Sequence, residues 1–287
     1  MTTTHERLTS QMRHPGRLAA IFLLVVGVLV GGAASPALAH TGEANRGSGH
    51  GYTTASYVAL GDSFTAGQGA PPYLSGPCLR SQYSSYPSMV AAVSAYRLVA
   101  NNACSGARLV DIPGQLVGVS AATNLVTVTV GGIDAGSNEV FAACAPDPAS
   151  ALCQAAVTLS TSKLAALAPQ LAATYAGIAA AVPQARIVVL NYPRLFEPGL
   201  LPLADIVNAG TDGLNAAIQA AVVGLGDSRV TLVDVTQEFT NHGIGSRIPY
   251  INYVAATPLA PVNFHPNALG NALGYVGALV HDRVLRR

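Results

Sequence analysis

Ser63 is the first residue of this sequence whose surroundings suggest chemistry. It follows the apolar run 56–60, which predicts a short buried parallel strand, and the turn residues 61–62. A side chain just past the carboxyl end of such a strand lies where open α/β sheets bind their ligands. Gly67 and Gly69 follow closely, and glycines let backbone N–H groups approach a ligand without a Cβ in the way.

The tripeptide Gly-Asp-Ser occurs twice, and the second copy shows the alternative interpretation. At residues 226–228 it precedes the predicted strand 229–235 instead of following a strand, and there it indicates a plain turn. Gly, Asp and Ser are all common turn residues, so residues 61–63 could also be a turn without chemistry. A base elsewhere in the chain is needed to favour the chemical interpretation.

His265 is the candidate for that base, because a serine hydroxyl is a weak nucleophile until a base removes its proton. It stands in the segment 262–270 (Val-Asn-Phe-His-Pro-Asn-Ala-Leu-Gly), where it opens a predicted C-terminal helix. The alternative role is that of a helix cap. His242 is predicted to be structural and His281 exposed. The other histidines lie in the predicted signal or leader: His5, His14, His40 and His50.

Strands and helices alternate along the chain. Strands are predicted at residues 56–60, 96–100, 125–130, 186–190 and 229–235, and helices at 84–95, 152–182, 211–223 and about 265–285, with a long Pro-rich connection at 191–208. This alternation predicts an α/β fold, a three-layer α/β/α sandwich with a flavodoxin-like parallel sheet of about five strands in the order 2-1-3-4-5. That order brings Ser63, Gly106 and Ile133 to one rim of the sheet.

The N-terminal segment predicts export. Basic Arg13 and Arg17 precede an apolar core and small residues that end at Ala39, which is typical of a secretory signal cleaved near that residue. We therefore divide the chain into a signal peptide (1–39), a disordered polar leader (40–54) and a single domain (55–287). We expect a secreted protein without a stable membrane anchor.

Composition argues against several classes of partner. The formal net charge is +1 and only 10% of residues are charged, which excludes the basic footprint of a nucleic-acid-binding protein. No constellation of metal ligands stands out, so neither a metal nor another cofactor is predicted. We expect a monomer.

Four cysteines, an even number in an exported chain, predict two disulfides. Of the three possible pairings we favour Cys78–Cys104 and Cys144–Cys153. The first would tie the segment after Ser63 to the loop after the second strand, and the second brackets a short polar loop. Zinc binding is the alternative, but no C-x-x-C spacing supports it.

Taken together, these motifs resemble the SGNH/GDSL hydrolases, in particular the secreted actinobacterial lipase/esterase branch. Residues 61–63 are similar to the family's block I, which carries the nucleophilic serine, and residues 265–267 to block V, whose histidine faces that serine. The resemblance covers about residues 56–285, and the two predicted disulfides sit where this branch has its first two bridges. It implies the SGNH hydrolase fold and a Ser63–His265 dyad that acts on small-molecule ester or lipid substrates.

Two positions depart from the family pattern. Val262 stands where the family usually has an aspartate, three residues before the histidine. Related esterases use a backbone carbonyl at that position, so the Val262 carbonyl is predicted to orient His265. The family's oxyanion hole combines the serine N–H, a block II glycine N–H and a block III asparagine side chain. Ser63 and Gly106 supply the first two here, but Ile133 occupies the block III position and has no side-chain donor.

Ile133 leaves three explanations open, because removing one oxyanion donor typically lowers kcat by about 10²–10³. Turnover is slow, or Asn102 or Asn138 supplies another donor, or the activity has been lost. The leading prediction is a serine esterase; the rivals are a binding protein on the same scaffold and a carbohydrate acetylesterase. The apolar segment 195–207 fits either an acyl-chain site or packed core. Asp134 is assigned a structural, loop-pinning role.

Overall fold

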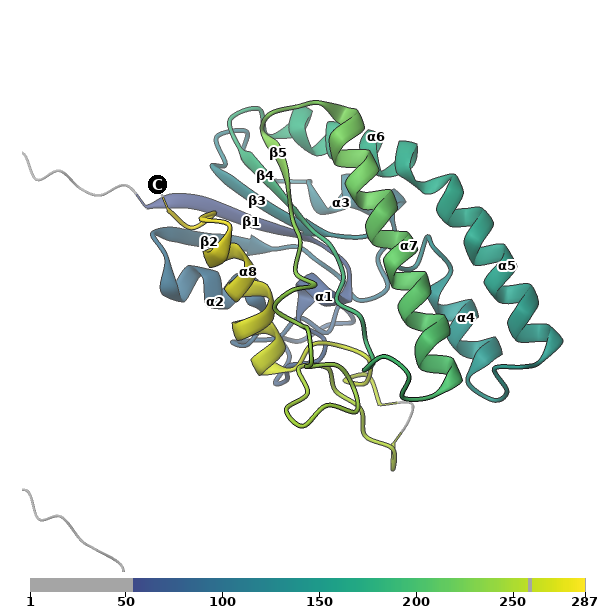
Figure 1. Ribbon diagram of the computed structural model, residues 1–287. Coiled ribbons are helices and arrows are strands. Elements are labelled where there is room, and N and C mark those ends of the chain that lie inside the picture. The colour runs from purple at the N-terminus through teal and green to yellow at the C-terminus, as the bar shows by residue number, and fades with distance from the viewer. Residues whose placement is uncertain (1–53, 258–259, 287) are drawn as a thin grey trace, which may run out of the picture. The chain divides into compact units, whose positions relative to one another are not determined.

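A single parallel sheet organises the domain. The computed structural model describes residues 54–257 and 260–286. Its five strands are β1 (Ala55–Gly61), β2 (Tyr96–Asn101), β3 (Leu125–Thr129), β4 (Arg186–Leu190) and β5 (Val230–Val233). All neighbouring strands pair in parallel, in the order β2-β1-β3-β4-β5 (Figure 1). The predicted strand order is confirmed, and β1 is flanked by β2 and β3.

Helices connect the strands. They are α1 (Ser63–Ala66), α2 (Tyr86–Val93), α3 (Ile112–Gln115), α4 (Ser137–Cys144), α5 (Ala151–Ala165), α6 (Leu167–Ala181), α7 (Pro202–Leu225) and α8 (Val276–His281), with a 3-10 turn at Leu109–Asp111 and a π-helix at Gly270–Tyr275. The predicted signal peptide, and all but the last residue of the predicted leader, lie outside the described residues.

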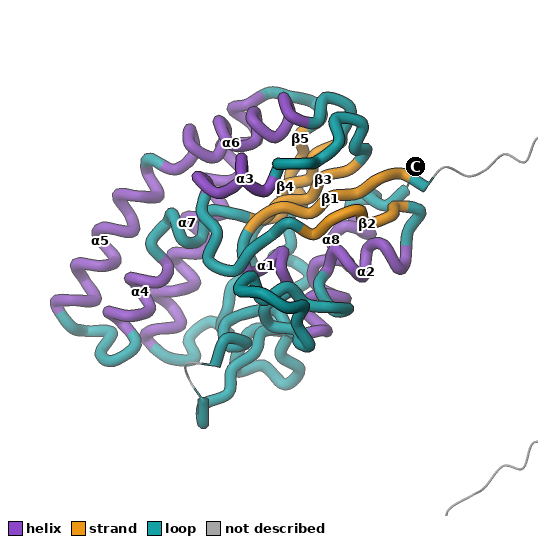
Figure 2. Tube along the Cα trace, turned by 180° about the vertical axis from the view of Figure 1, so that it is seen from behind, coloured by secondary structure: helices purple, strands orange, loops and turns teal. Residues whose placement is uncertain are grey.

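The two faces of the sheet carry separate cores, because successive side chains of a strand point to opposite faces. In β1, Tyr57 and Ala59 pack into a core shared with α2 and α8. Val58 and Leu60 pack into the opposite core, shared with α6 and α7. Figures 1 and 2 show these helices on the two sides of the sheet. The result is the three-layer sandwich that the alternation predicted.

The long helix predicted at 152–182 is in fact two helices. α5 ends at Ala165 and α6 begins at Leu167, with a bend of 49° between them. Pro169 explains the break, because a proline removes one backbone donor and its ring clashes with the carbonyl four residues earlier, here that of Ala165. Within the described residues no single helix is long and apolar enough to span a membrane, although this bent pair meets the length and composition criteria together.

Two other boundaries differ from prediction. The Pro-rich connection ends sooner than expected, since α7 begins at Pro202, and proline is well suited to the first turn of a helix. The C-terminal helical segment begins at Ala268, so His265 precedes it in an irregular loop.

The two disulfides join Cys78 to Cys104 and Cys144 to Cys153, which confirms the predicted pairing.

Candidate active site

Ser63 lies at the carboxyl end of β1, as the first residue of the short helix α1. Asp62 caps this helix, and its carboxylate accepts a hydrogen bond from the Phe64 N–H at 2.9 Å. A side-chain oxygen that accepts from an early helical N–H stabilises the first turn. The cap therefore fixes the orientation in which the partly buried Ser63 leaves the strand.

Gly61 permits the sharp exit from β1. Its φ of +128° favours glycine, and a Cβ there would overlap the Thr129 carbonyl oxygen at the end of β3. The same carbonyl accepts from the Asp62 N–H at 3.0 Å. The Gln115 side chain binds both backbone groups of Gly61, accepting from its N–H at 2.7 Å and donating to its carbonyl at 2.8 Å. The end of β1 is thus held from both sides.

His265 and Ser63 meet, although 202 positions separate them in the chain. The Nε2 atom of His265 lies 2.8 Å from the Ser63 Oγ, and its Nδ1 atom lies 2.7 Å from the Asn263 carbonyl oxygen. A carbonyl can only accept, so Nδ1 carries the proton and Nε2 is free to accept from the serine hydroxyl. This is the arrangement that a Ser-His proton transfer needs.

The carbonyl that orients His265 is that of Asn263, and the prediction of Val262 is wrong by one residue. Phe264 has a φ of +60°, which turns the chain so that the carbonyl two residues before the histidine faces its ring. The Asn263 side chain fixes this turn by accepting from the Val254 N–H and donating to the Thr257 carbonyl, both at 2.8 Å. No aspartate is required for this orientation.

Gly69 brings the histidine loop against the serine loop. A Cβ at Gly69 would overlap the Pro266 carbonyl oxygen and would lie 2.7 Å from the His265 carbonyl oxygen. The Asn252 side chain reinforces the contact, because its Nδ2 donates to the Gly69 carbonyl at 2.7 Å and to the His265 carbonyl at 3.3 Å. Close backbone approach therefore sets the distance between nucleophile and base.

The surroundings of His265 favour its neutral form. The imidazole is enclosed by protein on most sides, and this loss of solvation lowers its pKa to about 4. The hydrogen bond to the Asn263 carbonyl raises the pKa, but by less than burial lowers it. At neutral pH the ring is therefore uncharged and able to accept a proton.

The two backbone N–H groups predicted for an oxyanion hole are those of Ser63 and Gly106. Among the described residues, no partner accepts a hydrogen bond from the N–H of Ser63 or of Gly106. Gly106 has a φ of +76° and lies on the loop after β2, which is joined to the end of β1 where the Cys104 N–H donates to the Gly61 carbonyl at 3.0 Å. Both N–H groups are available to a ligand.

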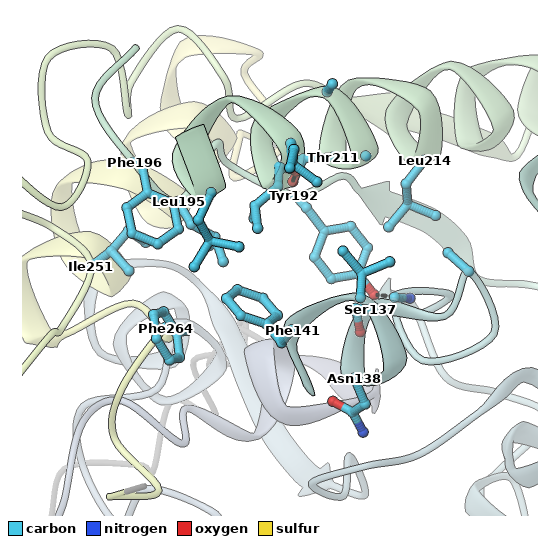
Figure 3. Close-up of a pocket in the computed structure, with 18 of the residues that line it drawn as sticks. Ser137, Asn138, Phe141, Tyr192, Leu195, Phe196, Thr211, Leu214, Ile251 and Phe264 are labelled. Carbon is cyan, nitrogen blue, oxygen red and sulfur yellow. Dashed lines mark hydrogen bonds between the residues drawn. The ribbon is translucent and has the colours of Figure 1, made fainter. Parts of the chain in front are cut away.

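Asn102 and Asn138 were the side chains predicted as alternative donors in place of a block III asparagine. Neither is held beside Ser63 by a hydrogen bond among the described residues. Asn102 is held elsewhere, since its Nδ2 donates to the Gln115 carbonyl at 2.7 Å. Asn138 is an exposed residue at the start of α4 (Figure 3). Asp134 accepts from the Leu109 N–H at 3.1 Å and so pins the loop after β2, in agreement with the structural role predicted for it.

A cavity of about 1530 Å³ opens beside the Ser63–His265 pair. Ser63, Ile133 and His265 line it, whereas Gly106 does not. Most of the remaining lining is aliphatic or aromatic and comes from α4, α5, α7, the loop after β4 and the loop of His265. Figure 3 shows Phe141, Leu195, Phe196, Leu214 and Phe264 among these side chains. This volume exceeds the ~300–1,000 Å³ usual for a small-molecule site. The segment 195–207 contributes both to this wall and to packed core.

Sequence reasoning missed several residues that support the site. Gln68 connects the loop that carries His265 to the loop after β2. The Gln68 Nε2 donates to the Pro261 carbonyl at 2.6 Å, and the Gln68 Oε1 accepts from the Ser105 hydroxyl. Tyr192 binds the Asp62 carboxylate. The only sequence signal for Gln68 was its place between Gly67 and Gly69, and polar side chains that bind backbone groups far along the chain leave no periodic pattern.

The fold and the site define a class. A parallel α/β sheet that carries a serine and a histidine in hydrogen-bond contact at the carboxyl ends of its strands, beside an apolar cavity, has the architecture of an ester hydrolase. The family model of the GDSL-like lipase/acylhydrolase family matches residues 59–273. The chain belongs to this family, and it is a carboxylic ester hydrolase.

Relatives with lipase names are found in Streptomyces. A lipase of Streptomyces rimosus is 34% identical over 258 residues, covering 85% of this chain and 93% of the relative. Lipase 1 of Streptomyces coelicolor is 32% identical over 232 residues, covering 78% and 85%. Two solved structures match with a TM-score of 0.71 and cover 79% of this chain and 99% of their own: the extracellular lipase of S. rimosus at 33% identity and phospholipase A1 of Streptomyces albidoflavus at 31%.

No metal site stands beside this pair in the part of the chain that is described. Within residues 54–257 and 260–286, no three His, Cys, Asp or Glu side chains come together in a group that could hold a metal ion.

Proposed function

We propose that this protein hydrolyses carboxylic esters with lipophilic acyl groups through a Ser63–His265 dyad. The observation that carries the proposal is the 2.8 Å contact between the His265 Nε2 and the Ser63 Oγ at the wall of a large apolar cavity. Similarity to lipases and to a phospholipase A1 supports the substrate class.

The reaction proceeds in two halves. Ser63 Oγ attacks the ester carbonyl carbon while its proton passes to His265 Nε2, and a tetrahedral oxyanion forms. The C–O bond to the alcohol then breaks, and His265 returns the proton to the leaving oxygen. Water repeats the sequence on the acyl-enzyme, again with His265 as base and then acid. The Asn263 carbonyl holds the ring throughout but places no formal negative charge opposite the imidazolium.

Two backbone donors stabilise the oxyanion in this proposal, the N–H groups of Ser63 and Gly106. Both lack partners among the described residues, so binding an oxyanion satisfies donors that are otherwise unpaired. Ile133 contributes apolar wall instead of a third donor. We therefore expect a slower enzyme than one with an asparagine at this position.

The cavity favours acyl chains over sugars. Each methylene that moves from water into an apolar site contributes about 0.8 kcal/mol, which is roughly fourfold in affinity. A lining dominated by aliphatic and aromatic side chains offers few hydrogen bonds to carbohydrate hydroxyls. The proposal thus places a lipophilic acyl group, rather than a sugar acetate, in this space.

The proposal also includes that the protein is exported and acts as a monomer. Similarity to an extracellular lipase supports the export.

The test is hydrolysis of p-nitrophenyl esters by the purified domain. We expect measurable kcat/KM for the acetate that rises with acyl length through the butyrate and beyond. Ser63→Ala and His265→Ala should each lower kcat by at least about 10²-fold, since each removes one partner of the proton transfer. Unchanged hydrolysis in either variant would overturn the dyad.

A second candidate function is a binding protein that retains the scaffold with weakened catalysis. Ile133 is the observation in its favour, because it removes a side-chain donor while adding apolar surface to the cavity. Such a protein would bind long-chain esters or fatty acids without turnover, and Ile133→Asn would confer activity on an inert wild type. Measurable wild-type hydrolysis that depends on Ser63 would exclude it.

A further inference from the structure

Tyr192 links the two loops that surround the reacting atoms. It stands two residues after the end of β4, is 4% exposed, and lines the cavity. Its hydroxyl donates to the Asp62 Oδ2 at 2.5 Å and accepts from the Gly132 N–H at 3.2 Å. Asp62 immediately precedes Ser63, and Gly132 immediately precedes Ile133. One oxygen atom therefore binds both the nucleophile loop and the loop that faces it.

The ring that carries this hydroxyl is itself fixed. The Asn215 side chain, from α7, accepts from the Tyr192 N–H at 3.0 Å and donates to its carbonyl at 2.8 Å. Phe64 packs edge-on against the ring with centroids 5.0 Å apart. A Cβ at Gly132 would lie 3.6 Å from the ring, so this loop packs against its face. In Figure 3 the ring points from the α7 side toward the loop before α4.

We propose that Tyr192 is a positioning residue for ester hydrolysis, whose hydroxyl fixes the Ser63 loop relative to the loop of Ile133. The inference rests on the proposed function, and it assigns to this buried phenol the alignment of the Ser63 N–H with the substrate. Since the Ile133 side chain has no donor, this bond to Tyr192 holds its loop in place of a side-chain contact with the oxyanion.

The link works with an ionised Asp62. Its Oδ1 accepts from the Phe64 N–H and its Oδ2 from Tyr192, so both oxygens act as acceptors. A proton on Oδ2 would reverse this bond, so that Asp62 donates to the phenol oxygen and the phenol proton loses its acceptor. Protonation of Asp62 therefore replaces a charge-assisted hydrogen bond with a weaker neutral one and loosens the link between the loops.

Asp62 loses its charge close to neutral pH. Burial raises its pKa to about 7, although the hydrogen bonds from Tyr192 and Phe64 lower it, and the charge of Asp134 raises it further. The other ionisable groups that sense this carboxylate are buried phenols: Tyr86, Tyr175 and Tyr275. Because burial lowers the pKa of His265 to about 4, we expect the acid limb of kcat to follow Asp62 and not His265.

The test is Tyr192→Phe, assayed with p-nitrophenyl butyrate over a range of pH. We expect kcat to fall by about tenfold or more at pH 8, since small misplacements of reacting groups lower rates steeply, with KM changing less. The acid limb should move to higher pH, because the carboxylate loses the donor that favours its charged form. Tyr175→Phe is the matched control, since its buried hydroxyl has no hydrogen-bond partner among the described residues, and it should keep the wild-type profile.

A wild-type kcat and acid limb in Tyr192→Phe would overturn the inference. Should that variant fail to fold, Asp62→Asn provides the second test: it should show reduced kcat without an acid limb near pH 7, and persistence of the limb would contradict the role given to Asp62. Ser63→Ala, measured in parallel, separates the hypotheses. Activity retained in Ser63→Ala refutes the proposed dyad, whereas its loss together with a normal Tyr192→Phe refutes only the role of Tyr192.

Discussion

The two sides of Ser63 are built differently. On the base side, both ring nitrogens of His265 have partners, and its carbonyl accepts from the Asn252 N–H at 3.0 Å. On the side that we assign to the oxyanion, the N–H groups of Ser63 and Gly106 have no partner among the described residues, and the Ile133 side chain offers no donor. One side is closed by the protein, whereas the other is completed only by a ligand.

This difference follows from what each side must do. A base has to stay within hydrogen-bond distance of the hydroxyl in every turnover, so contacts within the protein that hold it are useful. An oxyanion donor must be unpaired before the reaction, because a donor that is already satisfied gains little when charge develops. We therefore expect substitutions that loosen the base side to have larger effects than changes on the oxyanion side.

Gly69→Ala should have the largest effect among the substitutions that leave the dyad residues in place. Its Cβ would overlap the Pro266 carbonyl and press on that of His265, so the histidine loop must move. A displacement of about 1 Å lowers the rate roughly 10²-fold. We expect that loss in kcat for p-nitrophenyl butyrate, with KM little changed.

Gly224→Ala is the control for that experiment. This glycine is exposed near the end of α7, and a Cβ added there would meet no atom within 4 Å, so alanine should raise stability by up to about 1 kcal/mol. Its kcat should equal that of the wild type. Wild-type kinetics in Gly69→Ala would mean that the base side tolerates movement, contrary to the comparison.

Ile133→Asn tests the oxyanion side and should act in the opposite direction. An added side-chain donor in this loop is expected to raise kcat about tenfold, less than the full 10²–10³ of an optimised donor, because the neighbouring groups are packed around isoleucine. Ile133→Val, which offers no donor, serves as the control. A lower kcat in Ile133→Asn than in Ile133→Val would show that this loop does not face the oxyanion.

The sequence predicted the sheet topology and the disulfides better than the hydrogen bonds that position the site residues. Strand order followed from apolar runs and the right-handed crossover rule. The Cys78–Cys104 pair was chosen for its place beside the ends of the first two strands, and the Cys144–Cys153 pair because it brackets a short polar loop. The break between α5 and α6 was missed although Pro169 marks it. The identity of the orienting carbonyl depends on the φ of Phe264, a backbone angle that a bulky aromatic residue rarely adopts and that no local pattern announces.

The two disulfides offer a third test of the comparison. Cys104 stands two residues before Gly106, whereas Cys144 and Cys153 join α4 to α5. Replacing either pair with serine should lower the free energy of unfolding by about 2–4 kcal/mol, more for the longer loop of Cys78–Cys104. Only loss of Cys78–Cys104 should also lower kcat, by several-fold, since the Gly106 N–H gains freedom. Equal kcat in both double variants, measured well below their melting temperatures, would show that this bridge does not position the donor.

Gln68 joins the two sides, and its replacement should give the smallest effect. Gln68→Met keeps the length of the side chain but removes the bonds to Pro261 on the base side and to Ser105 on the oxyanion side. Ser105→Ala removes only the second bond. Because the base side is more sensitive to movement, we expect kcat to fall a few-fold in Gln68→Met and to change less in Ser105→Ala. Equal losses in the two variants would assign the effect to the oxyanion side and reverse the order of importance proposed for the two sides of Ser63.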